Sequence, residues 1–218
     1  MTALDCRVVV PERGVEVSLD VPAGQTLALT GPNGSGKSTV LSALAGWLRP
    51  HAGHARLGDV TLFDRDRHLW TPARRRKVGY LTQDPLLFPH LTAEANVAFG
   101  LRRAGVVGHR ERQAVARQWL ERVGLGDLAQ RRPHQLSGGQ AQRAAIARVL
   151  ASDPALVLLD EPLSALDSHV VPEIRRLLSE VLRERTTVLV THHDADTDAL
   201  ADLTHDLTKA TPAPPPTA

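Results

Sequence analysis

The sequence predicts an α/β fold in which a mostly parallel sheet is flanked by helices. Four short runs are apolar at consecutive positions, as in strands that are buried on both faces of a parallel sheet. They are TLALT at 26–30, KVGYLTQ at 77–83, ALVLLD at 155–160 and TTVLVTH at 186–192. Helical patterns lie between these runs, and this alternation is typical of α/β domains. Each run ends in polar residues, so we expect the chemistry to gather at one edge of the sheet.

The first strand runs directly into GPNGSGKST at 31–39, which matches the G-x-x-x-x-G-K-[ST] pattern of a phosphate-binding loop. Glycines let backbone amides wrap a phosphate chain, Lys37 supplies charge to the β- and γ-phosphates, and the Ser38 hydroxyl can bind Mg²⁺. The predicted phosphate-binding residues are Gly31, Pro32, Asn33, Gly34, Ser35, Gly36, Lys37, Ser38 and Thr39.

Helical patterns dominate between the second and third strands. In ERQAVARQWLERVGL, residues Val115, Trp119, Leu120 and Val123 recur at helical spacing. From about residue 84 to residue 133 the strand signal disappears, which predicts a helical subdomain inserted between two parts of the sheet. The basic run at 74–77 has no interleaved aromatic residues, so we expect a solvated charged face and not a nucleic-acid site.

The segment HQLSGGQAQRAAIAR begins at His134 and contains a helix start. Ser137 and Gln140 have capping-box spacing, so we predict a helix from Ser137 to about Leu150. One interpretation is simply a well-capped helix. The consecutive Gly138 and Gly139 are poor helix formers, however, and their use indicates close approach of a backbone or a ligand.

The third strand ends in two adjacent carboxylates in VLLDEP at 157–162. Asp160 would hold Mg²⁺ through water, and Glu161 could orient and deprotonate the attacking water. Two carboxylates at a sheet edge can also be surface charges or helix caps. With a phosphate-binding loop in the same predicted sheet, the pair indicates a Mg²⁺-dependent nucleotide hydrolase.

GPNGSGKST, Gln83, LSGGQ, VLLDEP, SALD and TH, in that order, resemble the motif series of the ABC-transporter ATPases over about residues 14–202. The resemblance implies a P-loop NTPase fold with an inserted helical subdomain. We expect a single ABC ATPase domain over 1–208, with a RecA-like core at about 1–83 and 151–208 and a helical subdomain at about 84–150. The proline-rich end, 209–218, is expected to be disordered.

The resemblance also implies the roles of residues that local chemistry leaves open. Gln83 would contact Mg²⁺ and water and report to a membrane subunit, and His192 would be the switch histidine at the γ-phosphate. Implied catalytic residues are Lys37, Gln83, Glu161 and His192, and implied metal ligands are Ser38, Gln83 and Asp160. ATP and Mg²⁺ are the implied cofactors.

In this family the LSGGQ segment contacts the nucleotide held by a second subunit. The resemblance therefore implies a head-to-tail dimer in which Ser137, Gly138, Gly139, Gln140 and Asp167 act across the interface; Asp167 ends the D-loop, which begins at Ser164. Such a segment adds donors and a helix dipole to the far side of the γ-phosphate. THHDADTD at 191–198 can also be interpreted as a metal cluster, although neighbouring Asp and His residues more often lie in solvent.

The segment from Trp70 to Arg103 is similar to importer-type subunits, and its pairing of HLWTPARRRKVGY with LFPHLT most resembles molybdate importer ATPases. This likeness implies an ATPase on the cytoplasmic face of the plasma membrane, bound peripherally through a separate integral membrane permease. Phe88 to Thr92 and the following helix would lie near the groove that receives the permease. Sulfate, polyamine or iron are alternative cargoes, and a soluble non-transport ABC ATPase or a regulatory nucleotide-binding protein with little turnover are alternative functions.

Bulk properties agree with a subunit that does not itself cross a membrane. The 218-residue chain is 42% hydrophobic with a formal charge of +2, too small a charge to indicate a nucleic-acid partner. No apolar run approaches the roughly 18 residues of a membrane span. The single Cys6 cannot form an internal disulfide, and no cleavable apolar segment follows Met1, so a reducing cytoplasmic compartment is expected.

Three features depart from the family pattern. No aromatic residue precedes the phosphate loop to stack on adenine, so Arg13 is the candidate in its place. The C-terminal oxyanion-binding domain of molybdate-type subunits is absent from the sequence. LTHDLTKATPAPPPTA lacks the apolar hairpin pattern that normally follows, so we expect the sheet to lack its last strands.

Overall fold

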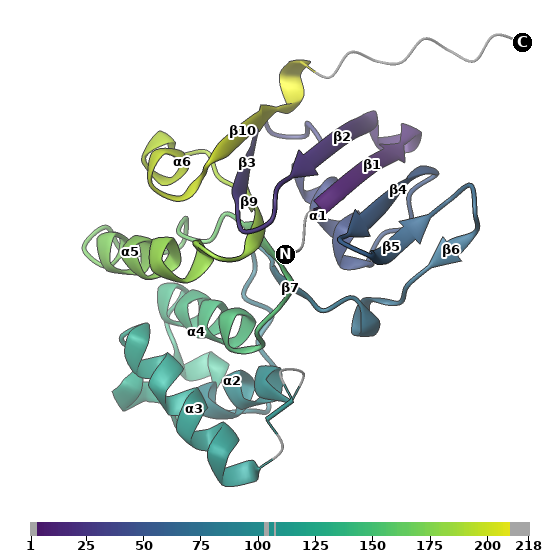
Figure 1. Cartoon of the computed structure of the whole chain (residues 1–218). Helices are drawn as coiled ribbons and strands as arrows, with labels where there is room; N and C mark the ends of the chain where they lie inside the picture. Colours follow the sequence, from purple (N-terminus) through teal and green to yellow (C-terminus); the bar gives the residue numbers. More distant parts are fainter. Residues whose placement is uncertain (1–3, 103–104, 107, 210–218) are drawn as a thin grey trace, which may run out of the picture.

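The predicted parallel sheet is present in a computed structural model that describes residues 4–102, 105–106 and 108–209 (Figure 1). Its strand order is β10-β3-β9-β8-β7, and every neighbouring pair is parallel. The strands are β3 (Thr26–Thr30), β7 (Val78–Leu81), β8 (Leu156–Asp160), β9 (Thr186–Val190) and β10 (Leu203–Asp206). The four strands predicted from apolar runs are therefore confirmed.

The fifth strand of this sheet, β10, was not predicted. Leu203–Asp206 pairs with β3, and the backbone amide of Thr26 donates to the Asp202 carboxylate at 2.8 Å, which anchors the start of the strand. The expectation that the sheet lacks its last strands is wrong for this segment. An edge strand needs backbone pairing on one side only, so its side chains need not be apolar. Of the predicted tail, residue 209 ends the 3-10 turn η5 (Leu207–Lys209), and 210–218 lie outside the described residues.

A second sheet, antiparallel throughout, has the order β2-β1-β4-β5-β6. Its strands are β1 (Leu4–Val10), β2 (Val15–Val21), β4 (Ala52–Leu57), β5 (Val60–Asp64) and β6 (Leu69–Trp70). In β1, Leu4, Cys6, Val8 and Val10 are buried, whereas the alternate residues lie on the outer face. This period of two marks a strand with one solvated face. This alternating pattern differs from the continuous apolar runs on which the predicted strands were based, so the antiparallel sheet was not predicted.

Helices cover both faces of the parallel sheet (Figure 1). They are α1 (Lys37–Ala45), α2 (Ala93–Leu101), α3 (His109–Arg122), α4 (Gly138–Ala151), α5 (Val171–Leu182) and α6 (Asp194–Leu200), with the 3-10 turns η1 (Pro11–Arg13), η2 (Ala73–Arg75), η3 (Gly126–Leu128) and η4 (Pro133–Gln135). Leu158 and Val188 pack with α1 and the antiparallel sheet, whereas Val157 and Leu189 pack with α4 and α5. The parallel sheet thus separates two hydrophobic cores.

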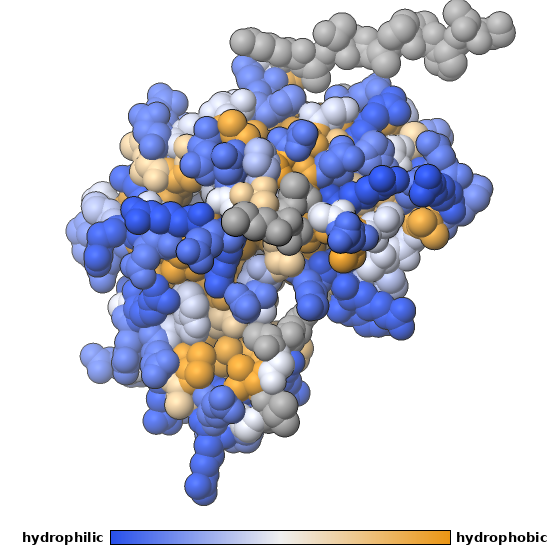
Figure 2. Space-filling model, in the orientation of Figure 1, coloured by the Kyte–Doolittle hydropathy of each residue, from blue (hydrophilic) through white to orange (hydrophobic). Residues whose placement is uncertain are grey.

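Between β7 and β8 the described residues form helices and turns without a strand. Helices α2, α3 and α4 pack on one another there, and Leu120 and Val123 from the predicted α3 pattern are fully buried. Figure 2 shows apolar residues gathered over this helical unit on an otherwise largely hydrophilic face. Within residues 4–102, 105–106 and 108–209, none of the helices has the length and hydrophobicity needed to cross a membrane.

One arginine of the basic run at 74–77 is inside the protein. Only 1% of Arg76 is exposed, and its guanidinium donates to the carbonyls of Ala43 at 2.7 Å, Leu44 at 2.8 Å and Thr71 at 2.7 Å. The guanidinium also lies over the Trp70 ring, 4.4 Å from its centroid. Burial lowers the pKa of Arg76 to about 10. Arg76 therefore holds the C-terminal end of α1, whose last carbonyls have no helical partner.

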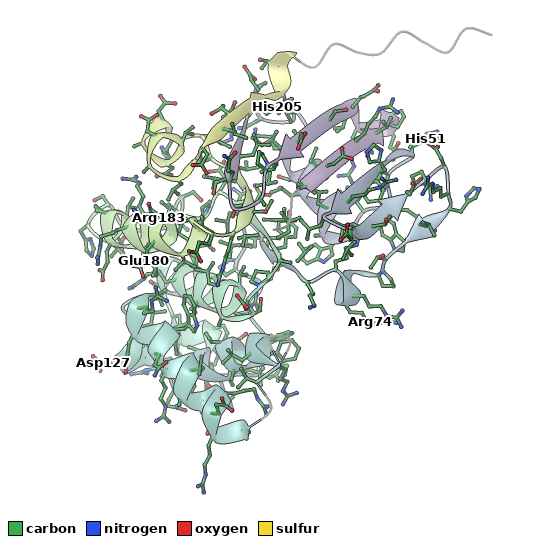
Figure 3. All side chains as sticks on the ribbon, viewed as in Figure 1. His51, Arg74, Asp127, Glu180, Arg183 and His205 are labelled. Carbon is green, nitrogen blue, oxygen red and sulfur yellow. The ribbon has the colours of Figure 1, made fainter. Side chains whose placement is uncertain are left out.

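The expectation of a solvated charged face is consequently wrong for Arg76 and correct for its neighbours. Arg74, Arg75 and Lys77 are exposed, and Figure 3 shows Arg74 on the outside of η2. The chain turns at η2, so only one of four consecutive basic side chains reaches the helix end. No property of the individual residues distinguishes it in the sequence.

Candidate nucleotide-binding site

Four strands of the parallel sheet deliver polar residues to one cavity of about 600 Å³. Lys37 begins α1 after the loop that follows β3, Gln83 follows β7, Glu161 follows β8 and His192 follows β9. The lining residues are Arg13, Asn33, Gly34, Gly36, Lys37, Ser38, Thr39, Gln83, Asp160, Glu161, Val190 and His192. Carboxyl ends of parallel strands meet at the same edge of a sheet, so these side chains converge.

The loop at 31–36 depends on backbone conformations that favour glycine. Gly34 has φ 82° and Gly36 has φ 96°. A Cβ on Gly36 would lie 2.2 Å from Cγ2 of Val15, so no side chain fits there. Lys37 is buried, and its Nζ donates to the carbonyls of Gly31 at 2.7 Å and Pro32 at 2.9 Å. The loop thereby holds a positive charge at its centre, where a phosphate chain would be wrapped.

Asp160 and Ser38, which both line this cavity, have oxygen atoms of the kind that bind Mg²⁺. The Asp160 carboxylate is 6% exposed and hydrogen-bonds the Ser38 side chain. Burial raises the pKa of Asp160, while the Ser38 hydrogen bond and the positive charge of Lys37 oppose that rise. Hydroxyl and carboxylate oxygens suit Mg²⁺, which usually binds one or two protein ligands together with phosphate oxygens and water. The residues present therefore fit this ion.

Tyr80 adds a contact at this site that was not predicted from the sequence. Its hydroxyl hydrogen-bonds the Asp160 carboxylate and the Ser42 side chain, and burial raises the pKa of Tyr80 to about 12. A phenol with a raised pKa stays protonated and can donate to the carboxylate. The available signal was a tyrosine in a strand that the sequence predicts to be buried, because a buried tyrosine needs a partner for its hydroxyl.

Glu161 and His192 form a pair at the mouth of the cavity. His192 Nε2 lies 3.0 Å from Glu161 Oε1, and the Glu161 carboxylate is the more buried partner. Glu161 has φ 54°, and its amide donates to the Val190 carbonyl at 2.9 Å. A non-glycine residue with positive φ is costly and persists where the surroundings fix it. The backbone therefore points this carboxylate away from Asp160 and toward His192.

The run THHDADTD at 191–198 has a structural explanation. Asp196 is buried, pairs with Arg175 Nη2 at 2.7 Å and accepts from the Thr191 hydroxyl at 3.2 Å. These bonds tie the start of α6 to α5 and to the end of β9. In the described part of the chain, no three His, Cys, Asp or Glu side chains group as a metal site would require.

Ser137–Gln140, which we call the signature segment, lies outside the cavity lining, as does Asp167. The predicted capping box is confirmed: Ser137 Oγ accepts from the Gln140 amide at 3.2 Å, and Gln140 Oε1 accepts from the Ser137 amide at 2.9 Å. Ser137 and Gly138 are exposed at the start of α4. A Cβ on Gly139 would meet the Ala165 carbonyl at 3.0 Å, so the segment packs closely on the loop after β8.

Arg13, the adenine-stacking candidate, also lines the cavity. It extends from η1, and its Nη1 donates to Thr39 Oγ1 at 3.3 Å. This hydrogen bond places the planar guanidinium at the start of α1, beside the predicted phosphate-binding loop. This position is compatible with stacking on a base.

Comparison with known proteins gives consistent matches. A family model described as ABC transporter matches residues 15–164. The molybdenum import ATP-binding protein of Mycobacterium tuberculosis (strain H37Rv) is 49% identical over 93% of this chain and 56% of its own length. An Fe(3+) ions import ATP-binding protein of Pseudomonas fluorescens is 44% identical over 86% of this chain and 52% of its own.

A solved structure, the dimeric post-hydrolysis state of the ATP-binding cassette MJ0796 bound to ADP and Pi, also matches. It has a TM-score of 0.77 and 31% identity, and the match covers 94% of this chain and 96% of that one. The likeness extends over the whole cassette. The chain spans about half the length of the curated relatives it matches.

Proposed function

Because the chain belongs to the ABC transporter family, we propose that it binds and hydrolyses ATP to drive import through a separate membrane permease. The observation that carries this proposal is the cavity in which Lys37, Asp160 and the Glu161–His192 pair converge from different strands. Its ligands would be ATP and Mg²⁺. The convergence of these side chains in one cavity supports phosphoryl transfer as the chemistry of the site.

The task of each side chain follows from its contacts. Lys37, held by two loop carbonyls, provides the positive charge for the β- and γ-phosphates. Ser38 and Asp160 would hold Mg²⁺, with Gln83 at the edge of the same cavity. When bound, Mg²⁺ neutralises charge on the phosphate oxygens during transfer.

Glu161 is the general base of the proposed reaction. Its carboxylate takes the proton of the water that attacks the γ-phosphoryl group, and the products are ADP and phosphate. His192, 3.0 Å from the Glu161 carboxylate, keeps that carboxylate oriented toward the site of attack. Asp160, one residue earlier, is the last buried residue of β8, whereas Glu161 lies beyond the strand, so one carboxylate would bind the metal and the other would take the proton.

A second copy of the chain completes the proposed site. The signature segment presents the first amides of α4 to solvent, and these amides have no intrahelical acceptor. A helix N-terminus is a good site for an anion, yet the segment does not line the cavity of its own chain. In a head-to-tail dimer, Ser137, Gly138, Gly139, Gln140 and Asp167 would face the nucleotide of the partner.

Dimerisation provides the direct test. Glu161→Gln should slow hydrolysis about 10²- to 10⁴-fold and accumulate an ATP-dependent dimer, measured by light scattering after size exclusion. Adding Ser137→Arg should abolish that dimer while nucleotide binding to the monomer persists. Ser137→Ala, which removes the cap without adding bulk, and Ser18→Arg on the exposed face of β2 are the controls. A monomeric Glu161→Gln protein at saturating ATP contradicts the dimer.

An apolar groove supports the permease as partner. It has a volume of about 370 Å³ and is lined by residues of α1, β7, α2 and α4. Trp47, Leu86 and Phe99, which are 59%, 55% and 42% exposed, all lie in it. Phe88, from the segment predicted to face the permease, lines it as well. We call this the docking groove, because exposed aromatic grooves receive short helices of partner proteins.

The docking groove can be tested by charge insertion. Phe99→Glu should prevent co-purification with the permease, whereas Val60→Glu, at another exposed apolar residue, on β5, should not. Basal ATPase activity of the isolated subunit should be the same in both variants, since neither residue lines the nucleotide cavity. Equal permease binding by the two variants contradicts docking at this groove.

For the cargo we propose molybdate or a related oxyanion. The relative from Mycobacterium tuberculosis supports this choice, and the iron import relative at 44% identity defines the main competitor. The test is to reconstitute the chain with its permease in vesicles. The binding protein is supplied on the side of the membrane opposite the ATPase. Molybdate, tungstate, sulfate, Fe³⁺ and polyamines are then compared for stimulated ATPase activity. Stimulation by a non-oxyanion alone overturns the cargo and leaves the importer function intact.

A further inference from the structure

Tyr80 occupies a position between the nucleotide cavity and the docking groove. It lies on β7 directly opposite Leu158 of β8, and Asp160 follows two residues later on the same face of the sheet. Tyr80 and Leu158 both belong to the hydrophobic core on the α1 side. Since side chains two residues apart share a face, Tyr80 reaches toward Asp160 beneath α1.

The two ends of the Tyr80 side chain contact different sites. Its hydroxyl hydrogen-bonds Asp160, the proposed magnesium ligand, and Ser42 in the middle of α1. Its ring packs against Trp47, with 5.1 Å between centroids and 58° between planes. A phenol has one proton, so the hydroxyl that donates to Asp160 accepts from Ser42.

Trp47 is the exposed member of this contact and faces the docking groove. It follows Gly46, the residue that ends α1, and 59% of its surface is exposed. Trp47 and Tyr80 both line the groove. An occupant of the groove would therefore press on an indole whose other side meets the Tyr80 ring.

We propose that Tyr80 is a positioning residue that links occupancy of the docking groove to the orientation of the Asp160 carboxylate. The groove half of this inference rests on the proposed function, in which the groove receives the permease. A partner that moves Trp47 shifts the Tyr80 ring, and the ring carries its hydroxyl relative to Asp160. Hydrogen bonds to a metal-binding carboxylate orient it, and losing one typically costs about 10- to 100-fold in metal affinity.

The isolated subunit provides the first test. Tyr80→Phe keeps the ring against Trp47 and removes only the hydroxyl. The probe is a non-hydrolysable ATP analogue, whose affinity is measured by calorimetry with and without Mg²⁺. The gain in affinity that Mg²⁺ gives should fall about tenfold in Tyr80→Phe, while affinity without Mg²⁺ stays unchanged. Ser18→Ala, which removes an exposed hydroxyl of β2 that lines neither the nucleotide cavity nor the docking groove, should behave as wild type.

Trp47 emission provides a second readout on the same samples. Binding energies between linked sites are reciprocal, so Mg²⁺ at the nucleotide cavity must alter the surroundings of the groove. The fluorescence of Trp47 is the part of the wild-type emission that is lost in Trp47→Phe. In wild type, adding Mg²⁺ to the nucleotide-bound subunit should change this part of the emission. Tyr80→Phe should lose most of that change. An unchanged Mg²⁺ effect on affinity and emission in Tyr80→Phe overturns the proposal.

The reconstituted complex separates this inference from the proposed function. Tyr80→Phe should bind the permease normally but show a lower ratio of stimulated to basal ATPase activity than wild type and Ser18→Ala. Equal stimulation ratios in all three proteins overturn the link between groove and cavity. If wild type itself fails to bind the permease, the proposed function is contradicted, and so is the proposed link between the docking groove and Asp160. The Mg²⁺ measurements then decide the contact between Tyr80 and Asp160 separately.

Discussion

Arg76→Met tests how strongly a buried arginine holds the C-terminal end of the phosphate-loop helix. Methionine keeps an unbranched chain beneath the Trp70 ring but removes the donors to Ala43, Leu44 and Thr71. Hydrogen bonds from a charged donor contribute about 1.5–3 kcal/mol each, and the cost of burying the charge offsets several kcal/mol of their sum. The expected net loss is about 3 kcal/mol in the free energy of unfolding.

The assay is thermal and urea unfolding of the isolated subunit. For a chain of this size, such a loss corresponds to a melting temperature lower by about 6–12 °C. Arg75→Met at the exposed neighbour should change the free energy of unfolding by less than about 0.5 kcal/mol. Arg76→Lys keeps the charge without the planar fork and should fall between the two. If Arg76→Met unfolds at the same midpoint as Arg75→Met, the role assigned to this arginine is refuted.

Three further predictions concern single side chains. His192→Ala should lower kcat about a hundredfold with little change in nucleotide affinity, since it removes the partner of the general base; a loss of affinity in calorimetry instead would contradict that role. Gly36→Ala should abolish nucleotide binding, because its Cβ would lie 2.2 Å from a methyl group of β2 and the residue has φ 96°; binding at wild-type affinity would disprove the steric reason. Asn96 is fully buried and hydrogen-bonds the loop before α2, so Asn96→Ala should lower the free energy of unfolding by about 2–4 kcal/mol. In the same melting experiment, Gln118→Ala at an exposed residue should leave the free energy of unfolding unchanged.

The parallel sheet was predictable because its central strands are buried on both faces. TLALT and TTVLVTH therefore carry consecutive apolar residues, a signal that does not depend on the rest of the fold. The phosphate loop was predictable for a similar reason, since its glycines are required by the positive φ angles of the loop itself and not by distant contacts. β10 gave no such signal: an edge strand is specified by backbone pairing with β3, and pairing partners are set by the fold.

Side chains whose surroundings come from distant segments could not be predicted. Arg76 and Arg75 are equivalent in the sequence, and only the turn at η2 brings one of them to the end of α1. Tyr80 was included in a predicted strand, but its contacts with Asp160 and Trp47 depend on how β8 and α1 pack on β7. Local pattern thus predicts which residues can act on phosphate, and tertiary packing decides which residues support them.

The placement of two helices connects the two surfaces of the proposed ATPase. Helix α1 begins at Lys37 in the nucleotide cavity and ends beside the docking groove, about 13 Å away for nine residues. Helix α4 begins at the signature segment and carries Arg148, whose guanidinium donates to the carbonyls of residues 85 and 86 at the groove. In the proposed dimer and permease complex, each helix would present one end to phosphate and the other to the permease. Helices of this length move as stiff units, so in the proposed complex a shift at the groove would reach both phosphate-facing ends. Arg76 and Tyr80 add polar contacts between α1 and the segment from η2 to β7.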